Sequence, residues 1–372
     1  MKKILNLVVT GGPCGGKTTA LDALGKYFRS EGYTVYIVNE TATELINDGM
    51  RPFGEHKLEV LEFQRLILKA QLAKESIRQI AAQDCKNDKV AIIYDRGILD
   101  NRAFITEAGF QQLIREEGIK EAEILKRYDL VIHLVTAAIG KEDYYTTANN
   151  SARTETIEQA RESDKRTMDA WRNHTNQKII PNDTLFDEKI QRVINVIRAF
   201  LGEEEVIEKK RYLVSVKDFD FEILNSMNLI KEDIEEFVKL YDDEEDEMYC
   251  KSTIDGSSYY TRVKNRYLKD GTFIKRCRNI GEEEYYGNRN VAKSKPIKKT
   301  RYNIIYDSER YRVDFFYLGK KSFIIVERDV IDESKMGLPP FIKNATDITY
   351  NRNYNDDSIC IDSFIDSIVG KK

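Results

Sequence analysis

Hydrophobic residues in the first half of the chain form short unbroken runs, and helical patterns lie between them. The runs lie at residues 4–9, 34–38, 90–94, 130–135 and 179–180. Residues 57–82 repeat apolar side chains with the spacing of a long helix, and residues 19–29 and 186–200 fit shorter helices. Strands this apolar are typical of a parallel sheet that helices cover on both faces. The pattern therefore predicts an α/β unit over residues 1–202.

A different pattern begins after the sequence Gly-Glu-Glu-Glu at residues 202–205. Polar and apolar side chains then alternate along short segments rich in tyrosine, arginine and lysine. These segments are residues 212–216, 248–253, 259–264, 272–278, 301–306, 311–316 and 323–329. Alternation of this kind predicts an antiparallel sheet or barrel. We therefore expect an α+β unit with an antiparallel β-barrel over residues 203–372, in which residues 279–296 form a long loop.

Residues 11–18, Gly-Gly-Pro-Cys-Gly-Gly-Lys-Thr, match the pattern G-x-x-x-x-G-K-[ST] between a predicted strand and a predicted helix. Glycines let backbone N–H groups approach a phosphate chain, and the N-terminus of the following helix is electropositive. Lys17 would contact the β- and γ-phosphates and Thr18 would hold Mg²⁺, so the motif predicts a P-loop NTPase fold that binds magnesium-complexed ATP or GTP. The predicted nucleotide contacts are Gly12, Pro13, Cys14, Gly15, Gly16, Lys17, Thr18 and Thr19. A glycine-rich turn without a ligand is the alternative.

Two carboxylates end predicted strands at the same edge of the sheet as this loop. We expect Asp95 to hold Mg²⁺ together with Thr18, and a helix cap is the alternative. Arg96 beside it would neutralise a phosphate or form a surface ion pair. Glu40 would accept a proton from an attacking hydroxyl or orient water, and its alternative is again a structural cap.

The polar segment 149–166 contains further candidates for catalysis and nucleotide binding. Arg153 and Arg161 would close over a triphosphate and stabilise the charge that develops during transfer of a phosphoryl group. For each arginine, the alternative is a solvated helix with ion pairs between successive turns.

In the second unit, alternate residues of a strand place charged side chains on shared faces. The pairs are Arg262 with Lys264, Lys299 with Arg301, and Glu327 with Asp329. Inside a barrel, the four cations would bind a polyphosphate and the two carboxylates would hold a divalent metal ion. Exposed outward faces of a half-buried sheet are an equally good interpretation.

Charge is distributed unevenly, although the net charge of the chain is only −4. Residues 202–250 carry 6 basic and 17 acidic side chains, and residues 251–301 carry 14 and 5. A basic block within an acidic chain favours a local anion site over a nucleic-acid surface. Five cysteines without a C-x-x-C motif, and no apolar run long enough to insert into a membrane, predict a reduced cytoplasmic protein.

Several motifs of the first unit occur together in a known family. They are residues 11–18, Glu40, Asp95-Arg96-Gly97, Arg153 with Arg161 and Asp164, and Trp171 with His174 and Asn182. Over about residues 3–200 this set resembles the NadR-like P-loop ATPase/GTPase family, and within it the TRPL-translocation-defect type. The resemblance implies a kinase-like fold related to small-molecule and nucleoside kinases, GTP binding, and recognition of phosphorylated lipid head groups.

Motifs of the second unit resemble a CYTH, or triphosphate tunnel, domain. They are residues 208–214, Arg262-Val263-Lys264, Lys299-Thr300-Arg301 and residues 326–329, in the order of that family. The family opens with E-x-E-x-K, of which Glu208 and Lys210 would take the last two fixed places, whereas Val206 stands in the first. The resemblance implies that Glu208, Lys210 and the four paired cations bind a polyanion. The missing carboxylate favours binding over hydrolysis of that ligand.

Three functions remain open at this point. The first is a magnesium-dependent ATP- or GTP-binding protein with NTPase activity, whose second unit binds a phosphoinositide head group or polyphosphate. Contact with a membrane would then be peripheral. The second is a small-molecule or nucleoside kinase with Glu40 as base. The third is an inorganic triphosphatase centred on the second unit. A nucleic-acid partner is not expected.

Overall fold

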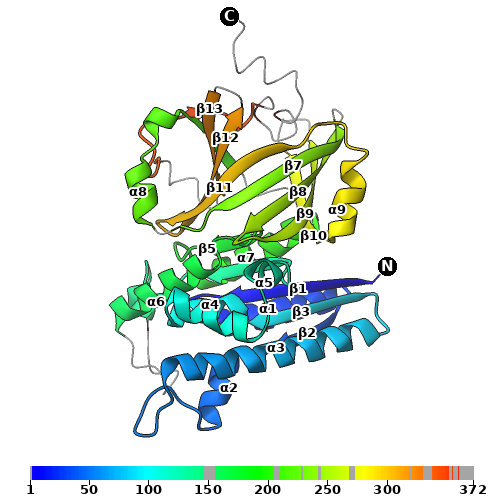
Figure 1. The fold of residues 1–372 in the computed structure, drawn as a ribbon. Coiled ribbons are helices and arrows are strands. Elements are labelled where there is room, and N and C mark those ends of the chain that lie inside the picture. Colours follow the sequence, from blue (N-terminus) through cyan, green and yellow to red (C-terminus); the bar gives the residue numbers. More distant parts are fainter. Residues whose placement is uncertain are drawn as a thin grey trace, which may run out of the picture. The chain divides into compact units, whose positions relative to one another are not determined.

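The computed structural model describes residues 2–145, 156–203, 209–227, 229–241, 244–267, 273–318, 321–329 and 337–351, together with Tyr354 and Ile359. The chain divides into two compact units, Met1–Ile197 and Arg198–Lys372. The boundary predicted after residue 202 lies a few residues beyond this division. Figure 1 shows the helices and strands of both units.

A parallel sheet forms the centre of the first unit. Its described strands are β1 (Lys3–Thr10), β2 (Thr34–Val38), β3 (Lys89–Asp95), β4 (Leu130–Leu134) and β5 (Gln177–Ile180). They lie in the order β2-β3-β1-β4-β5, and every neighbouring pair is parallel. β4 is buried along its whole length, as expected of a strand covered on both faces. In this order β3 lies on one side of β1 and β4 on the other, so the connections to later strands run to both sides of β1. Ligands bind at the carboxyl ends of the strands at such a switch point.

Helices of the first unit connect these strands. They are α1 (Lys17–Ser30), α2 (Thr41–Asn47), α3 (Val60–Asp84), α4 (Glu107–Glu116), α5 (Glu121–Leu125), α6 (Ile157–Ala170) and α7 (Phe186–Leu201), with 3-10 turns η1 (Ile98–Phe104) and η2 (Glu142–Tyr144). The long helix α3 runs alongside the sheet (Figure 1). Its buried face includes Gln64, Ile67, Leu68 and Gln71, which recur at spacings of three or four residues along one stripe.

The second unit contains one mainly antiparallel sheet. Its described strands are β6 (Lys209–Val214), β7 (Glu232–Tyr241), β8 (Glu245–Ile254), β9 (Ser257–Tyr267), β10 (Phe273–Ile280), β11 (Ile297–Tyr306), β12 (Glu309–Leu318), β13 (Lys321–Asp329) and β14 (Thr346–Asp347). Their order is β10-β9-β8-β7-β11-β12-β13-β6-β14, with antiparallel neighbours throughout. The remaining described helices are η3 (Val216–Asp218), α8 (Phe221–Ser226) and α9 (Glu282–Arg289).

The sheet of the second unit is curled, because strands distant in its order share one core. Val238 of β7, Val263 of β9 and Ile325 of β13 belong to one apolar cluster on the inner face. Val313 and Phe315 of β12 point the other way, into a cluster that α8 helps to cover. Charged residues of the inner face therefore lie inside the curl.

The predicted fold class, a parallel α/β P-loop unit followed by a mainly antiparallel β unit, is confirmed. The expected loop at residues 279–296 was wrong in part, because α9 occupies its middle. Glu282, Glu283 and Glu284 lie in the first turn of α9, where they complement the helix dipole, and Tyr285 is fully buried. No helix in the described part of the chain is both long and apolar enough to span a membrane.

Candidate functional site

The loop between β1 and α1 is pressed against the end of β4, and this contact explains its glycines. Gly11 has a φ of 138°, and a Cβ atom built on it would lie 2.2 Å from the carbonyl oxygen of Leu134. A Cβ atom on Gly15 would lie 2.6 Å from the same oxygen. Packing therefore demands glycine at both positions, independently of any phosphate ligand.

Lys17 lies across this loop. Its Nζ atom donates to the carbonyl oxygen of Gly11 at 3.0 Å and to that of Gly12 at 2.9 Å. Lys17 is also the first residue of the 14-residue helix α1, whose first backbone N–H groups have no partner within the helix. An ammonium group and a helix N-terminus thus meet at one place, which is the arrangement that binds phosphate groups.

Asp164 on α6 anchors the start of the loop. Its Oδ1 atom accepts hydrogen bonds from the backbone N–H of Gly12 at 2.7 Å and of Thr136 at 3.1 Å, and lies 3.1 Å from Nε2 of His133. Burial favours the protonated carboxyl, but His133 and the two N–H donors outweigh it and lower the pKa of Asp164. The charged side chain therefore ties α6 to the loop.

Lys189 on α7 supports the other end of the loop. This buried side chain donates to the carbonyl oxygens of Gly15 at 3.0 Å and Val135 at 2.7 Å, and to Oδ1 of Asn182 at 3.2 Å. Burial lowers the pKa of Lys189 to about 8. Sequence reasoning did not single out this residue, which holds the loop carbonyl that precedes Gly16 in a fixed place.

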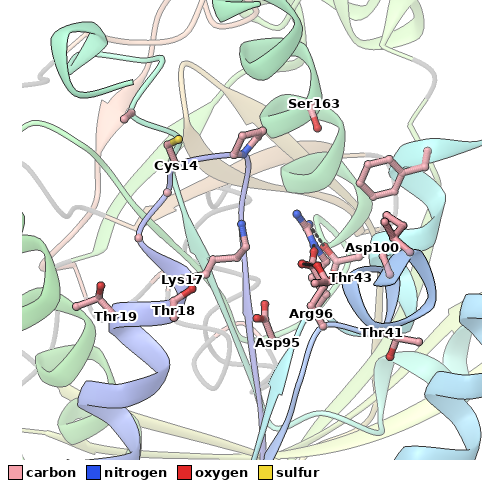
Figure 2. A pocket seen from close by; sticks show the side chains of 18 of the residues that line it. Cys14, Lys17, Thr18, Thr19, Thr41, Thr43, Asp95, Arg96, Asp100 and Ser163 are labelled. Carbon is pink, nitrogen blue, oxygen red and sulfur yellow. Dashed lines mark hydrogen bonds and ion pairs between the residues drawn. The ribbon is translucent and has the colours of Figure 1, made fainter. Parts of the chain in front are cut away.

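Asp95 ends β3 in the position predicted for a magnesium ligand. Its Oδ1 atom is buried and has no hydrogen-bond partner among the described residues. Burial, and next the negative charge of Glu40, raise the pKa of Asp95 to about 6. Asp95 and Thr18 both line one cavity, as Figure 2 shows. An unpartnered carboxylate oxygen in the same cavity as a hydroxyl fits a magnesium ion, whose remaining ligands would be water and phosphate oxygens.

Glu40 and Arg96 form an ion pair at the carboxyl ends of β2 and β3. Nε of Arg96 donates to Oε1 of Glu40 at 2.6 Å, and the Thr43 hydroxyl donates to Oε2 at 2.6 Å. Burial alone would raise the pKa of Glu40, but Arg96 and Lys17 outweigh it and lower the pKa to about 2. Arg96 adopts a left-handed φ of 68°, which directs the chain away from β3. Glu40 is therefore an ionised, positioned acceptor and a weak base.

These residues line a single cavity of about 1150 Å³ that passes over the loop. Its lining includes Cys14, Gly15, Gly16, Lys17, Thr18 and Thr19, together with Glu40, Asp95 and Arg96. Asn182, Leu185 and Phe186 also line it, as do side chains of α2, α3 and η1. Most of the predicted nucleotide contacts are therefore brought together. Gly12 does not line the cavity in this conformation, because it faces Asp164.

Of the two arginines predicted to close over a triphosphate, the structure describes only Arg161. Arg161 on α6 donates to the carbonyl oxygen of Ala138 at 2.7 Å and to Oε1 of Glu142 at 2.8 Å. It does not line the cavity in this conformation. Its partner Glu142 lies in η2 and not one turn away on α6, so this ion pair also differs from the alternative, and the predicted role of Arg161 stays a prediction. Arg153 lies outside the described residues, and its predicted role stays a prediction.

Inside the second unit, the predicted cations and carboxylates neutralise one another. Lys299 Nζ lies 2.8 Å from Glu236 Oε1 and 3.0 Å from Asp314 Oδ2, and Arg301 forms two hydrogen bonds to Asp314 at 2.6 and 2.7 Å. Lys299 is buried. These two residues therefore share an inner face, as the alternation predicted.

Glu327 and Asp329 also lie on the inner face, where Lys209 lies between them. Lys209 forms an ion pair with Glu327, and its Nζ lies 3.4 Å from Oδ1 of Asp329. Burial would raise the pKa of Glu327, but Lys209 and neighbouring cations hold it well below its ordinary value. No group of three or more His, Cys, Asp or Glu side chains within the described ranges could hold a metal ion. The two carboxylates do not fit the metal site expected from the sequence.

The other predicted cations lie on the opposite, outer face of the sheet. Arg262 Nε and Lys264 Nζ lie 2.9 and 3.4 Å from the carboxylate oxygens of Glu247. Lys210 Nζ lies 5.8 Å from the centre of the Tyr350 ring, on the face opposite to Lys209. The lysine of β6 that faces inward is therefore Lys209, one residue before the expected Lys210. Glu208 lies outside the described residues.

One comparison with known protein families concerns the first unit. Residues 6–189 match a family model described as an AAA domain, so this unit is similar to domains of that family. No curated protein matches the chain.

Among solved structures, the chain is similar to the inorganic triphosphatase NE1496, with 12% identity and a TM-score of 0.29 over 42% of this chain and 95% of that protein. It is also similar to the PH1819 protein from Pyrococcus horikoshii OT3, with 16% identity and a TM-score of 0.28 over 34% and 80% of the two chains.

Proposed function

We propose that the first unit binds a nucleoside triphosphate together with Mg²⁺ and acts on its γ-phosphate. The observation that carries this proposal is the convergence of Lys17, the N-terminus of α1 and the unpartnered carboxylate of Asp95 in one cavity. Mg²⁺ would neutralise phosphate charge, held by Thr18 and Asp95. Lys17 would exchange its bonds to the loop carbonyls for bonds to phosphate oxygens, and Arg96 would add a second positive charge.

Titration with fluorescent ATP and GTP analogues in the presence of Mg²⁺ tests this proposal. Lys17→Ala removes the ammonium group and should weaken binding at least tenfold, which corresponds to about 1.4 kcal/mol. Lys26→Ala is the matched control, because Lys26 lies on the same helix in an exposed ion pair with Asp22. Equal affinities for the wild-type protein and Lys17→Ala would contradict the proposal. The same titration measures the preference for ATP or GTP.

A kinase reaction is favoured over simple hydrolysis by the place of Glu40. Glu40 lines the same cavity as Lys17 and Thr18 and directly precedes α2, whose side chains also line it. A hydroxyl compound bound beside α2 would meet an ionised acceptor close to the γ-phosphate position. Release of phosphate at the same rate with and without hydroxyl compounds would favour the NTPase instead.

For the second unit we propose binding of a phosphorylated anion, such as a phosphoinositide head group or polyphosphate, without hydrolysis. The supporting observation is that Arg310 and Arg312 of β12 and Arg301 of the neighbouring strand β11 share the inner face. Burial, and next Arg312, lower the pKa of Arg310 to about 9, although Asp329 and Glu232 act in the opposite direction. A polyanion would add negative charge beside these three arginines. Inorganic triphosphatase activity is disfavoured because Lys209 already neutralises the two carboxylates that would hold metal.

Binding of tripolyphosphate, and sedimentation with vesicles that contain phosphorylated inositol lipids, distinguish the two sources of such an anion. Arg301→Gln should weaken binding to whichever probe is recognised, whereas Arg262→Gln on the outer face should not. Circular dichroism would verify that both variants fold. Release of phosphate from tripolyphosphate with Mg²⁺ or Mn²⁺ would contradict the absence of hydrolysis.

A further inference from the structure

The long helix α3 exposes two large apolar side chains on the face opposite to its buried one. Its buried residues Gln64, Ile67 and Gln71 mark the side that packs on the rest of the first unit. Ile77 and Ile80 lie on the other side, where they are 59% and 57% exposed. A lone exposed apolar residue is ordinary, whereas two that adjoin on one helix face form a candidate contact surface.

Small and charged side chains continue this surface along the helix. Ala73 and Ser76 are exposed beside the two isoleucines, and Lys69 and Asp84 are exposed at the two ends. All of them lie within about 50° of one line along the helix, because each residue advances the helix by about 100°. We call this set the α3 stripe. Its members are Lys69, Ala73, Ser76, Ile77, Ile80 and Asp84.

The α3 stripe is complementary to itself when a second copy runs in the opposite direction. Lys69 precedes Ala73 by four residues, and Asp84 follows Ile80 by four. Two antiparallel copies that meet between Ser76 and Ile77 therefore bring Lys69 level with Asp84 of the second copy. Ala73 then lies level with Ile80 of the second copy, so a small side chain leaves room for a large one. A parallel arrangement would instead bring like charges level with each other.

The charges at the ends of the stripe are available for contacts between two copies. The Lys69 side chain is 56% exposed, and its ion pair with Glu117, 2.7 Å long, lies at the surface. Such exposed pairs contribute only about 0–1 kcal/mol, so this pair does not hold Lys69 in place firmly. Asp84 forms no ion pair among the described residues. Both ends of the stripe can therefore pair with a charge on another chain.

We propose that two copies of this chain form a symmetric dimer in which their α3 stripes pack antiparallel. The twofold axis passes between Ser76 and Ile77, and each copy offers the same surface to the other. The contact runs from Lys69 to Asp84, a length of about 23 Å. A contact of one helix with one helix is small, so the dimer is weak and forms at micromolar or higher concentrations. No residue of the stripe lines the cavity of the phosphate loop, so the proposal is independent of the function proposed for that cavity.

Sedimentation equilibrium of the full chain, from low micromolar to hundreds of micromolar, tests the dimer. The weight-average mass should rise with concentration from one chain towards two. Ile80→Asp places a charge in the middle of the contact and should keep the mass at one chain throughout this range. Val291→Asp is the matched control, because Val291 is an apolar side chain of the second unit that is 64% exposed. This control should dimerise like the wild-type protein.

Reversal of the end charges tests the antiparallel register. Lys69→Glu and Asp84→Lys, each alone, bring like charges together at both ends, and each should weaken the dimer about tenfold. The double variant restores opposite charges and should recover most of the wild-type association. Lys69→Glu also loses the ion pair with Glu117, so the fluorescence of the buried Trp171 is measured to verify folding.

Two results would overturn the dimer itself. They are a mass of one chain at every concentration, and a dimer that Ile80→Asp leaves unchanged. A double charge variant that associates as weakly as the single variants would overturn the antiparallel register. Dimerisation that Ile80→Asp removes and the double charge variant restores would support both parts of the proposal.

Discussion

Replacing Gly11 by alanine tests whether packing against β4 shapes the phosphate loop. The new Cβ atom would lie 2.2 Å from the Leu134 carbonyl oxygen and 3.0 Å from the Leu134 carbonyl carbon, both of which are backbone atoms. The φ of 138° is also outside the range that alanine adopts readily. Backbone strain of about 1–3 kcal/mol and overpacking of about 1–3 kcal/mol together predict a loss of about 2–6 kcal/mol of unfolding free energy.

Gly118→Ala separates these two contributions. Gly118 has a φ of 67° in the same unit, and nothing within the described structure lies within 4 Å of the place that a Cβ atom would take. Only the conformational cost applies there, about 1–2 kcal/mol. The chain has one tryptophan, the buried Trp171, so tryptophan fluorescence during urea unfolding reports the first unit selectively. Equal destabilisation by the two substitutions would refute the packing argument for Gly11.

Three further predictions concern other parts of the two units. Asp164→Asn removes the charged acceptor of the Gly12 N–H and should weaken nucleotide binding about tenfold. The reason is that hydrogen bonds to charged groups contribute about 1.5–3 kcal/mol. An unchanged nucleotide affinity in the titration described above would contradict this prediction. Because the pKa of Glu40 is lowered to about 2, its stabilising effect is complete above about pH 4.5 and is lost as the pH falls towards 2. Glu40→Gln should therefore reduce the loss of unfolding free energy between about pH 4.5 and pH 2 by up to about 3 kcal/mol. An unchanged pH midpoint of acid unfolding would count against this prediction. Lys209→Met removes the cation that lies between Glu327 and Asp329, while Arg312 remains 3.0 Å from Glu327. It should destabilise the second unit by about 1.5–3 kcal/mol in chemical unfolding followed by circular dichroism, since hydrogen bonds to charged groups contribute about this much. Lys210→Met on the outer face should be nearly neutral, and equal effects of the two substitutions would contradict the inward position of Lys209.

The first unit could be predicted from its sequence because local pattern and chemistry agree there. Continuous apolar runs gave the parallel strands, and residues 11–18 gave the loop together with Lys17 and Thr18. Asp95 and Glu40 were placed correctly at strand ends, since parallel strands bring their carboxyl ends to one edge. Lys189 was missed, because a single lysine in a charged helix belongs to no motif.

The second unit was predicted less completely, because alternation fixes which residues share a face but not which face is inside. Arg262 and Lys264 do share a face, yet that face is the outer one. β7 was not recognised as a strand, since the buried Glu232 and Glu236 interrupt its apolar pattern. These carboxylates are buried because partners on distant strands satisfy them, for example Lys299 for Glu236. Such long-range pairing is not visible in a local pattern.

A crystal structure of the full chain grown with Mg²⁺ and a non-hydrolysable ATP or GTP analogue tests the central claim most directly. We predict that the phosphates lie over residues 11–18, that Lys17 leaves the carbonyl oxygens of Gly11 and Gly12 to contact them, and that the metal lies beside Thr18 and Asp95. A structure in which Lys17 keeps its present bonds, with the nucleotide bound elsewhere or not at all, would contradict this account.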